Sequence, residues 1–205
     1  MNTINLTTLA ALVSLCLTGV PANADLLQWD SPRFGANSLT LDTGTGLTWL
    51  DLPFTLDLSY LDAEAATQPG GKFTGFRHAT AQEVQSLYGS AGFGEGLILQ
   101  SSPSFQNVAS LISLVGQSSA QDGAPEALGI TGTLVNGHAV LAAMDYLLVN
   151  GTPGYLVSAV TGGAQYGLDT HFPTVGNWMV VVPEPSSCAL LLVAGALMMV
   201  LPRRR

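Results

Sequence analysis

The sequence predicts an α+β domain, and the order of its segments is the main reason. Short strand-like segments come first, two or three capped helical segments follow, and Val- and Ala-rich strand-like segments close the domain. Strands that are grouped, instead of alternating with helices, are typical of an antiparallel sheet with helices packed on one side. We therefore expect residues 25–182 to form one antiparallel sheet with two or three helices.

The first part of this domain predicts a β-hairpin. Leu39–Asp42 and Leu47–Leu50 are both strand-like, and the turn Thr43–Gly46 between them contains two glycines. Glycine tolerates the positive φ that a tight hairpin turn requires. We expect residues 25–52 to consist of short strands.

Two helices are marked by capping boxes. In this motif the N-cap hydroxyl accepts from the backbone amide three residues later, and the acidic side chain at that position accepts from the N-cap amide. Ser59 and Asp62 begin the first predicted helix, which ends before Pro69. Thr80 and Glu83 begin the second, which carries an apolar stripe and ends at the glycines that follow.

A third helix is predicted over Pro103–Val115. Ser102 would be its N-cap, and proline is favoured at the first helical position because its missing amide has no partner there. Gly116 would end the helix. The small-residue segments Gly89–Pro103 and Ser118–Pro125 are predicted to be loops.

The rest of the domain predicts strands. Gly129–Val135 and His138–Val149 flank Asn136-Gly137, the dipeptide with the strongest preference for a two-residue hairpin turn. Tyr155–Val160 is a further predicted strand. Asn177–Val182 is predicted to be the last strand of the domain.

The charge of the domain argues against nucleic acid as a partner. Residues 25–182 hold 13 acidic residues and three cations, a net charge of −10. The three cations are Arg33, Lys72 and Arg77. Such a field repels phosphate backbones and anionic lipid surfaces. The two cysteines, Cys16 and Cys188, lie outside the domain, so we expect no disulfide and no thiolate zinc site within it.

The first 24 residues predict a secretory signal peptide. Leu9–Val20 is an apolar run, and Ala22 and Ala24 form an A-x-A cleavage site. We therefore expect export through the Sec translocon with cleavage after Ala24. The alternative is that this segment is a buried N-terminal strand or helix.

The last 23 residues combine three features in order. A Pro-Glu-Pro motif is followed by the uncharged apolar segment Ser186–Leu201 and then by Pro202 and a basic cluster. The motif and the cluster are Pro183, Glu184, Pro185, Arg203, Arg204 and Arg205. The apolar segment spans about 24 Å as a helix, close to the thickness of a hydrocarbon core. We expect a transmembrane helix whose arginines stay in the cytoplasm, and the alternative is a core helix at the end of a soluble domain.

This arrangement resembles the PEP-CTERM sorting signal of Gram-negative bacteria. The resemblance implies that an exosortase recognises the tail, cleaves near Pro183, Glu184 and Pro185, and transfers the protein from the inner membrane to the cell surface. It also implies association with exopolysaccharide or a biofilm.

Asp42–Leu87 carries a second resemblance, to a domain common in PEP-CTERM proteins. This domain is similar to the C-terminal domain of a Legionella collagen-like adhesin. The resemblance implies a C-type-lectin-like fold, in which two helices pack on a sheet whose first and last strands pair. Phe76 and His78-Ala79 stand where the adhesin domain has Trp and Leu-Pro. The segments that carry the resemblance are Thr45–Asp51, Ser59–Ala63, Gly75–Thr80 and Glu83–Leu87.

Five residues are candidates for chemistry, and we expect none of them to be catalytic. Arg77, His78 and Glu83 gather at the start of the second helix, but the capping box alone explains Glu83. His138 and His171, with Asp145, could contribute to a metal site or a triad, yet no pair has metal-ligand spacing. We expect no metal and no cofactor.

Two further expectations concern ligands. The loop and strand signatures of calcium-dependent sugar-binding lectins are absent. Trp29, Trp49 and Trp178 are predicted to be core residues, because aromatic residues on short strands usually pack inside.

Taken together, these features predict an exported, non-catalytic protein of the cell surface or extracellular matrix. The alternatives are a secreted hydrolase or a carbohydrate-binding module delivered by the same tail.

Overall fold

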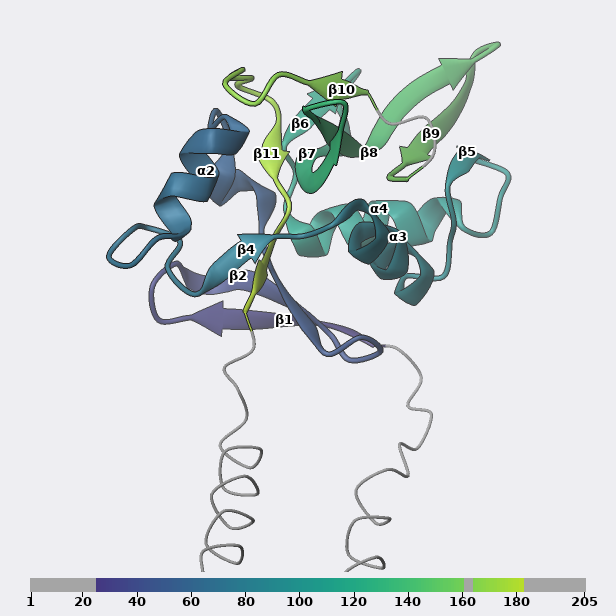
Figure 1. Cartoon of the computed structure of the whole chain (residues 1–205). Helices are drawn as coiled ribbons and strands as arrows, with labels where there is room; N and C mark the ends of the chain where they lie inside the picture. The colour runs from purple at the N-terminus through teal and green to yellow at the C-terminus, as the bar shows by residue number, and fades with distance from the viewer. Residues whose placement is uncertain (1–24, 161–163, 183–205) are drawn as a thin grey trace, which may run out of the picture.

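The computed structural model describes residues 25–160 and 164–182, and it shows a mixed α+β domain (Figure 1). The predicted signal peptide with Ala22 and Ala24 lies outside these residues. So does the predicted tail with its Pro-Glu-Pro motif, apolar helix and arginines. Within the two described ranges, no helix is both long and apolar enough to cross a membrane.

Five strands form the first sheet, in the order β1-β2-β3-β12-β4. Every pair in it is antiparallel. Its strands are β1 (Leu26–Ser31), β2 (Gly35–Asp42), β3 (Leu47–Leu50), β4 (Phe76–His78) and β12 (Met179–Val181). The hairpin predicted around Thr43–Gly46 is confirmed, since Asp42 pairs with Leu47 and Leu39 with Leu50.

A second sheet has the order β11-β7-β8-β9-β5, with β10 added on β8 and β6 on β7. Only β11 runs parallel to its neighbour, β7, among the described pairs. The strands are β5 (Gly96–Leu99), β6 (Ser119–Gln121), β7 (Ala124–Val135), β8 (His138–Val149), β9 (Thr152–Ser158), β10 (Gln165–Tyr166) and β11 (Gly176–Asn177). Asn136 and Gly137 have φ of 51° and 77°, which confirms the predicted hairpin turn.

Both capping boxes are confirmed. In α2 (Tyr60–Thr67) the Ser59 hydroxyl accepts from the Asp62 amide, and in α3 (Ala81–Ser90) Thr80 and Glu83 form the same arrangement. The start of the third helix was predicted wrongly. Helix α4 (Phe105–Val115) begins two residues after Pro103, with Ser104 as its N-cap, and it ends at Gly116 as predicted.

The expectation of one sheet was wrong, because the last segment of the domain divides between two. β11 pairs with β7 in the second sheet, and β12 pairs with β3 and β4 in the first. Trp178 lies between these two short strands, and its amide donates to the Ile130 carbonyl. The predicted single strand Asn177–Val182 is therefore a connection between the sheets.

The expected pairing of the first and last strands was also wrong. β1 and β12 lie in the same sheet, but β2 and β3 separate them. β12 joins the edge of β3 and pairs with β4 on its other side, and the outer edge of β1 stays unpaired in this sheet.

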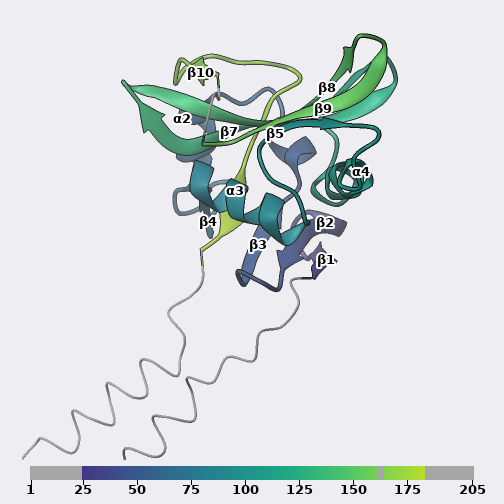
Figure 2. The same ribbon diagram turned by 90° about the vertical axis from the view of Figure 1, so that its right-hand side faces the viewer.

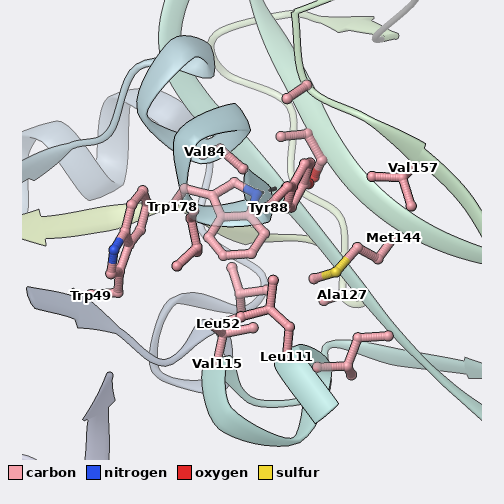
Figure 3. Packing of buried hydrophobic residues seen from close by; sticks show 14 of the residues in the cluster. Trp49, Leu52, Val84, Tyr88, Leu111, Val115, Ala127, Met144, Val157 and Trp178 are labelled. Atoms are coloured by element: carbon pink, nitrogen blue, oxygen red, sulfur yellow. Dashed lines mark hydrogen bonds between the residues drawn. The ribbon is translucent and has the colours of Figure 1, made fainter. Parts of the chain in front are cut away.

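The main core lies between the sheets. Helices α3 and α4 fill the space between the two layers (Figures 1 and 2). Trp49 from the first sheet and Trp178 meet edge to face, with 6.0 Å between their ring centroids, and Leu52, Tyr88 and Leu111 pack around them (Figure 3). A short 3-10 helix, η1 (Leu52–Thr55), supplies Leu52.

Trp49 and Trp178 are fully buried, as predicted, but Trp29 is not. Trp29 lies on the edge strand β1 and is 55% exposed. The pattern of an apolar strand therefore does not place this ring in the core.

Both ends of the domain leave from the same end of the first sheet. Leu26 pairs with Asp42, and Asp42 pairs with Leu47 at the start of β3. β12 runs antiparallel to β3, so its last residues also lie toward the start of β3. The two ends leave the domain on the same side in both views (Figures 1 and 2).

Candidate functional site

Arg77 and Glu83 form a two-pronged ion pair at the start of α3. Arg77 Nη1 donates to Glu83 Oε2 at 2.8 Å, and Nη2 donates to Oε1 at 2.6 Å. The Thr80 amide also donates to Glu83 Oε2, at 2.8 Å. These donors, Arg77 foremost, lower the pKa of Glu83. Both oxygens of Glu83 therefore have structural partners, as a capping role requires.

His78 is buried and has a partner at each ring nitrogen. Nδ1 lies 3.2 Å from Glu64 Oε2, and Nε2 lies 3.1 Å from Asn177 Oδ1. The Tyr60 ring stacks on the imidazole at 4.3 Å between centroids. The Asn177 amide nitrogen donates to the Leu58 carbonyl at 3.0 Å, which turns Oδ1 toward His78. Neither ring nitrogen of His78 is left for a metal or a substrate.

The other two histidines have different partners from those of His78. His138 is exposed at the β7–β8 turn, where Nδ1 contacts the Asn136 carbonyl. His171 Nε2 lies 3.1 Å from Asp62 Oδ2, and Nδ1 lies 2.9 Å from the Asp57 carbonyl. Arg77, His78 and Glu83 are therefore adjacent, whereas no hydrogen bond or ion pair between described residues joins His138 or His171 to them.

Ser59, Asp62 and His171 form a chain that contains the residue types of a catalytic triad in a different order. The Ser59 hydroxyl donates to Asp62 Oδ2 at 2.6 Å, and His171 contacts the same oxygen. A triad requires the imidazole between the hydroxyl and the carboxylate, because the imidazole accepts the hydroxyl proton. Here the carboxylate is in the middle, so these three side chains do not have the order of a catalytic triad.

Two buried carboxyl groups were not found by sequence reasoning. Burial raises the pKa of Asp51 to about 7. Glu126 on β7 faces Asp145 on β8, because Ala127 pairs with Met144. Burial, and then the neighbouring Asp145, raises the pKa of Glu126. Within the described ranges, no group of three or more His, Cys, Asp or Glu side chains could hold a metal ion.

An open pocket of about 440 Å³ lies between the β1–β2 turn and the loop that joins α2 to β4. It is lined by Arg33, Gly70, Gly71, Lys72 and Thr74. Figure 1 shows the two loops on the same side of the domain. The pocket thus gathers two of the three cations of residues 25–182.

Backbone carbonyls hold both cations of the pocket in place. Arg33 Nη1 donates to the carbonyl oxygens of Lys72 and Thr74, at 3.2 and 2.9 Å. Lys72 Nζ donates to the Phe54 carbonyl at 3.0 Å and lies 4.9 Å from the centre of the Phe73 ring. Among the described residues, neither cation has a carboxylate within ion-pair distance. The pocket therefore keeps its positive charge.

An aromatic cluster supports these loops. Phe34 packs against three other rings, with centroid distances of 5.3 to 6.0 Å. The partners are Phe54, Phe73 and Phe76. They form one apolar cluster with Leu39, Leu50 and Met179 on the outer face of the first sheet. The pocket is thus built on a packed base.

No protein-family model, curated protein or solved structure matches the chain. Function is therefore inferred from the residues and contacts of this chain alone.

Proposed function

We propose that this chain is an exported, non-catalytic protein of the cell surface or extracellular matrix. The observation that carries the proposal is the tail, in which Pro183-Glu184-Pro185, the apolar segment and three arginines follow one another. In this proposal the Sec translocon exports the chain and the tail anchors it in the inner membrane. An exosortase then cleaves near the Pro-Glu-Pro motif and releases the domain toward exopolysaccharide.

The position of the two domain ends supports this route. Both ends of the domain lie on one side of the first sheet (Figures 1 and 2). With the tail held in the membrane, the second sheet would therefore face away from the membrane.

The contacts of the nominated residues support a non-catalytic domain. Glu83 serves the capping box and the Arg77 pair, and His78 is enclosed by Glu64, Asn177 and Tyr60. General acid–base catalysis needs a group that can reach a substrate proton. The contacts of Glu83 and His78 instead stabilise the folded domain.

We also propose a relationship to the C-type-lectin-like fold. The two capped helices and the return of the last strand to the first sheet support it. The pairing of β12 with β3 and β4, instead of with β1, departs from the expected pattern.

A carbohydrate-binding module carried by the same tail is the second candidate function. The pocket at Arg33 and Lys72 is the observation that favours it, because its two cations have no acidic partner among the described residues.

The sorting proposal is tested by replacing Pro183, Glu184 and Pro185 with alanine in the full chain. We expect the variant to stay uncleaved in the inner-membrane fraction, since the recognition motif is lost. Matched controls are Pro69→Ala and Pro103→Ala, which remove exposed prolines within the domain and should leave processing unchanged. Normal cleavage and release of the triple-alanine variant would overturn the proposal.

A further inference from the structure

We propose that the pocket between the β1–β2 turn and the α2–β4 loop binds an acidic polysaccharide. In this proposal, a sugar oxyanion lies between Arg33 and Lys72. The inference rests on the proposed surface function and names the ligand of the pocket described above.

The charge distribution of the domain is the first reason. Residues 25–182 have a net charge of −10 and three cations. Glu83 neutralises Arg77, whereas Arg33 and Lys72 both line the pocket without a carboxylate partner among the described residues. An anion that approaches an acidic surface gains Coulomb energy only where positive charge is concentrated. The pocket is such a place.

The fixed position of the cations is the second reason. Nη1 of Arg33 is held by two carbonyls, and Nη2 and Nε make no hydrogen bond to the described residues, so they remain able to donate to a ligand of the pocket that Arg33 lines. A guanidinium presents two parallel donors that match the two oxygens of a carboxylate or sulfate. The Phe54 carbonyl and the Phe73 ring hold the ammonium of Lys72, which lines the same pocket. Binding therefore costs little side-chain entropy, because both cations are already ordered.

The backbone of the loop keeps the pocket open. Gly70 has φ of +86°, a conformation that favours glycine, and no atom lies within 4 Å of the position that a side chain would occupy. A bulky ligand such as a pyranose ring can therefore approach the Gly70 edge.

Trp29 and Leu27 form an exposed apolar strip on the face of the first sheet that carries the aromatic cluster. Trp29 pairs with Leu39 and Leu27 with Leu41, and directly opposite residues point to the same face. Leu39 belongs to the aromatic cluster that supports Lys72, so Trp29 and Leu27 share the face of that cluster. Trp29 is 55% exposed and Leu27 is 47% exposed. In the proposed complex, one charged sugar occupies the pocket, and the apolar C–H faces of neighbouring sugars in the polymer pack on this strip.

A flexible hydrated polymer fits this site better than a membrane or a nucleic acid. A lipid surface or a duplex would bring many negative charges against the 13 acidic residues of the domain. A polysaccharide can place one oxyanion in the pocket and keep its other charges in solvent.

The test measures binding of polysaccharides to the full chain, purified in a neutral detergent, by titration calorimetry at low salt. The probes are polygalacturonate, dextran sulfate, uncharged dextran and glycerol phosphate as a lipid-headgroup mimic. We expect polygalacturonate or dextran sulfate to bind, with an affinity that falls as salt rises. Arg33→Gln and Lys72→Gln should each weaken binding about tenfold.

Matched variants separate the site from general charge effects. Arg77→Gln removes the same charge outside the pocket and should leave the affinity unchanged, and Lys72→Arg keeps the charge and should retain binding. Circular dichroism would show whether Arg33→Gln disturbs folding. If it does, the comparison of Lys72→Gln with Lys72→Arg still tests whether the pocket binds the polymer. The Trp29→Ala variant should lose more affinity for polygalacturonate than for the monosaccharide galacturonate.

Several results would overturn the proposal. They are equal binding of uncharged dextran, binding of glycerol phosphate alone, no binding of either acidic polymer, or acidic-polymer binding that Lys72→Gln leaves intact. Polysaccharide binding is measured on detergent-purified chain, so its failure is distinct from a failure of sorting, which is read from the cell fraction.

Discussion

Asp51→Asn should stabilise the protein at neutral pH, although it removes a charged group. Asp51 lies between β3 and η1 and is 6% exposed. Its nearest side-chain donor is the Thr40 hydroxyl at 3.5 Å, but that hydroxyl lies 2.9 Å from the Leu114 carbonyl and directs its single proton there. The carboxylate is therefore buried without strong compensation, and burial raises its pKa to about 7.

The raised pKa fixes the sign of the pH dependence. The folded state holds the Asp51 proton up to about pH 7, whereas the ordinary value is 3.8. Below the unfolded pKa, Asp51 is protonated in both the folded and the unfolded state, so its burial carries no charge penalty. As the pH rises from there through the folded pKa, the folded state becomes progressively less stable relative to the unfolded state. A difference of about three pH units corresponds to about 4 kcal/mol. Relaxation of the surrounding structure around the charge reduces this, so we expect a gain of about 2–4 kcal/mol for Asp51→Asn at pH 7.5.

The assay is urea unfolding of wild type and Asp51→Asn between pH 4 and 8. The two proteins should have similar stability near pH 4 and should diverge as the pH rises. The matched control is Asp42→Asn, at the end of β2. The Asp42 carboxylate accepts from the Gly44 and Thr45 amides and from the Thr45 and Ser90 hydroxyls, at 2.8 to 3.3 Å. An amide has one acceptor oxygen instead of two, so Asp42→Asn should lose about 1–3 kcal/mol. An Asp51→Asn variant that is less stable than wild type at pH 7.5 would refute the reasoning.

The remaining predictions use the same kind of measurement. Gly129→Ala should lose about 1–3 kcal/mol, because its added carbon would lie 2.7 Å from the Trp178 indole; unchanged stability would contradict the packing. Gly89→Ala, in α3 with nothing within 4 Å, should gain about 0.5–1 kcal/mol, and a loss would show that the helix cannot accept a side chain there. Glu83→Ala should lose about 0.5–2 kcal/mol through the capping box; a fully stable variant that had lost ligand binding would instead indicate a functional role. For Glu126→Gln, the raised pKa of Glu126 predicts a gain that appears only as the pH rises, in urea unfolding at pH 5 and pH 8; a gain of equal size at both values would exclude titration as the cause.

Local signals in the sequence identified the elements that depend on local chemistry. Both capping boxes and the Asn136-Gly137 turn involve residues within four positions of each other, and all three are confirmed. The same signal was present but not used at Asp122-Gly123 and Asn150-Gly151, which have positive φ at both positions. These two turns join β6 to β7 and β8 to β9.

The division into two sheets could not be read from local pattern. Asn177–Val182 is rich in apolar residues along its whole length, so nothing marks Trp178 as the point where the chain passes between sheets. That passage depends on the Trp178 amide reaching Ile130 and the indole reaching Ala142, contacts that are distant in sequence.

The pocket is hidden in the sequence for the same reason. Arg33 and Lys72 are 39 positions apart and meet only because two loops converge on one aromatic cluster. The one available signal was the scarcity of cations, since a domain with three of them makes each one informative. Trp29 shows the opposite error, in which an aromatic residue on a strand was assigned to the core but lies on an exposed edge.

The central claim is that both ends of the chain are removed and the domain reaches the cell exterior. Intact-mass spectrometry of the protein recovered from the cell surface or the medium tests it most directly. We expect a species that begins at Asp25 and ends near Pro183-Glu184-Pro185, without Ser186–Arg205. A recovered species that keeps Ser186–Leu201, or that begins at Met1, would contradict it.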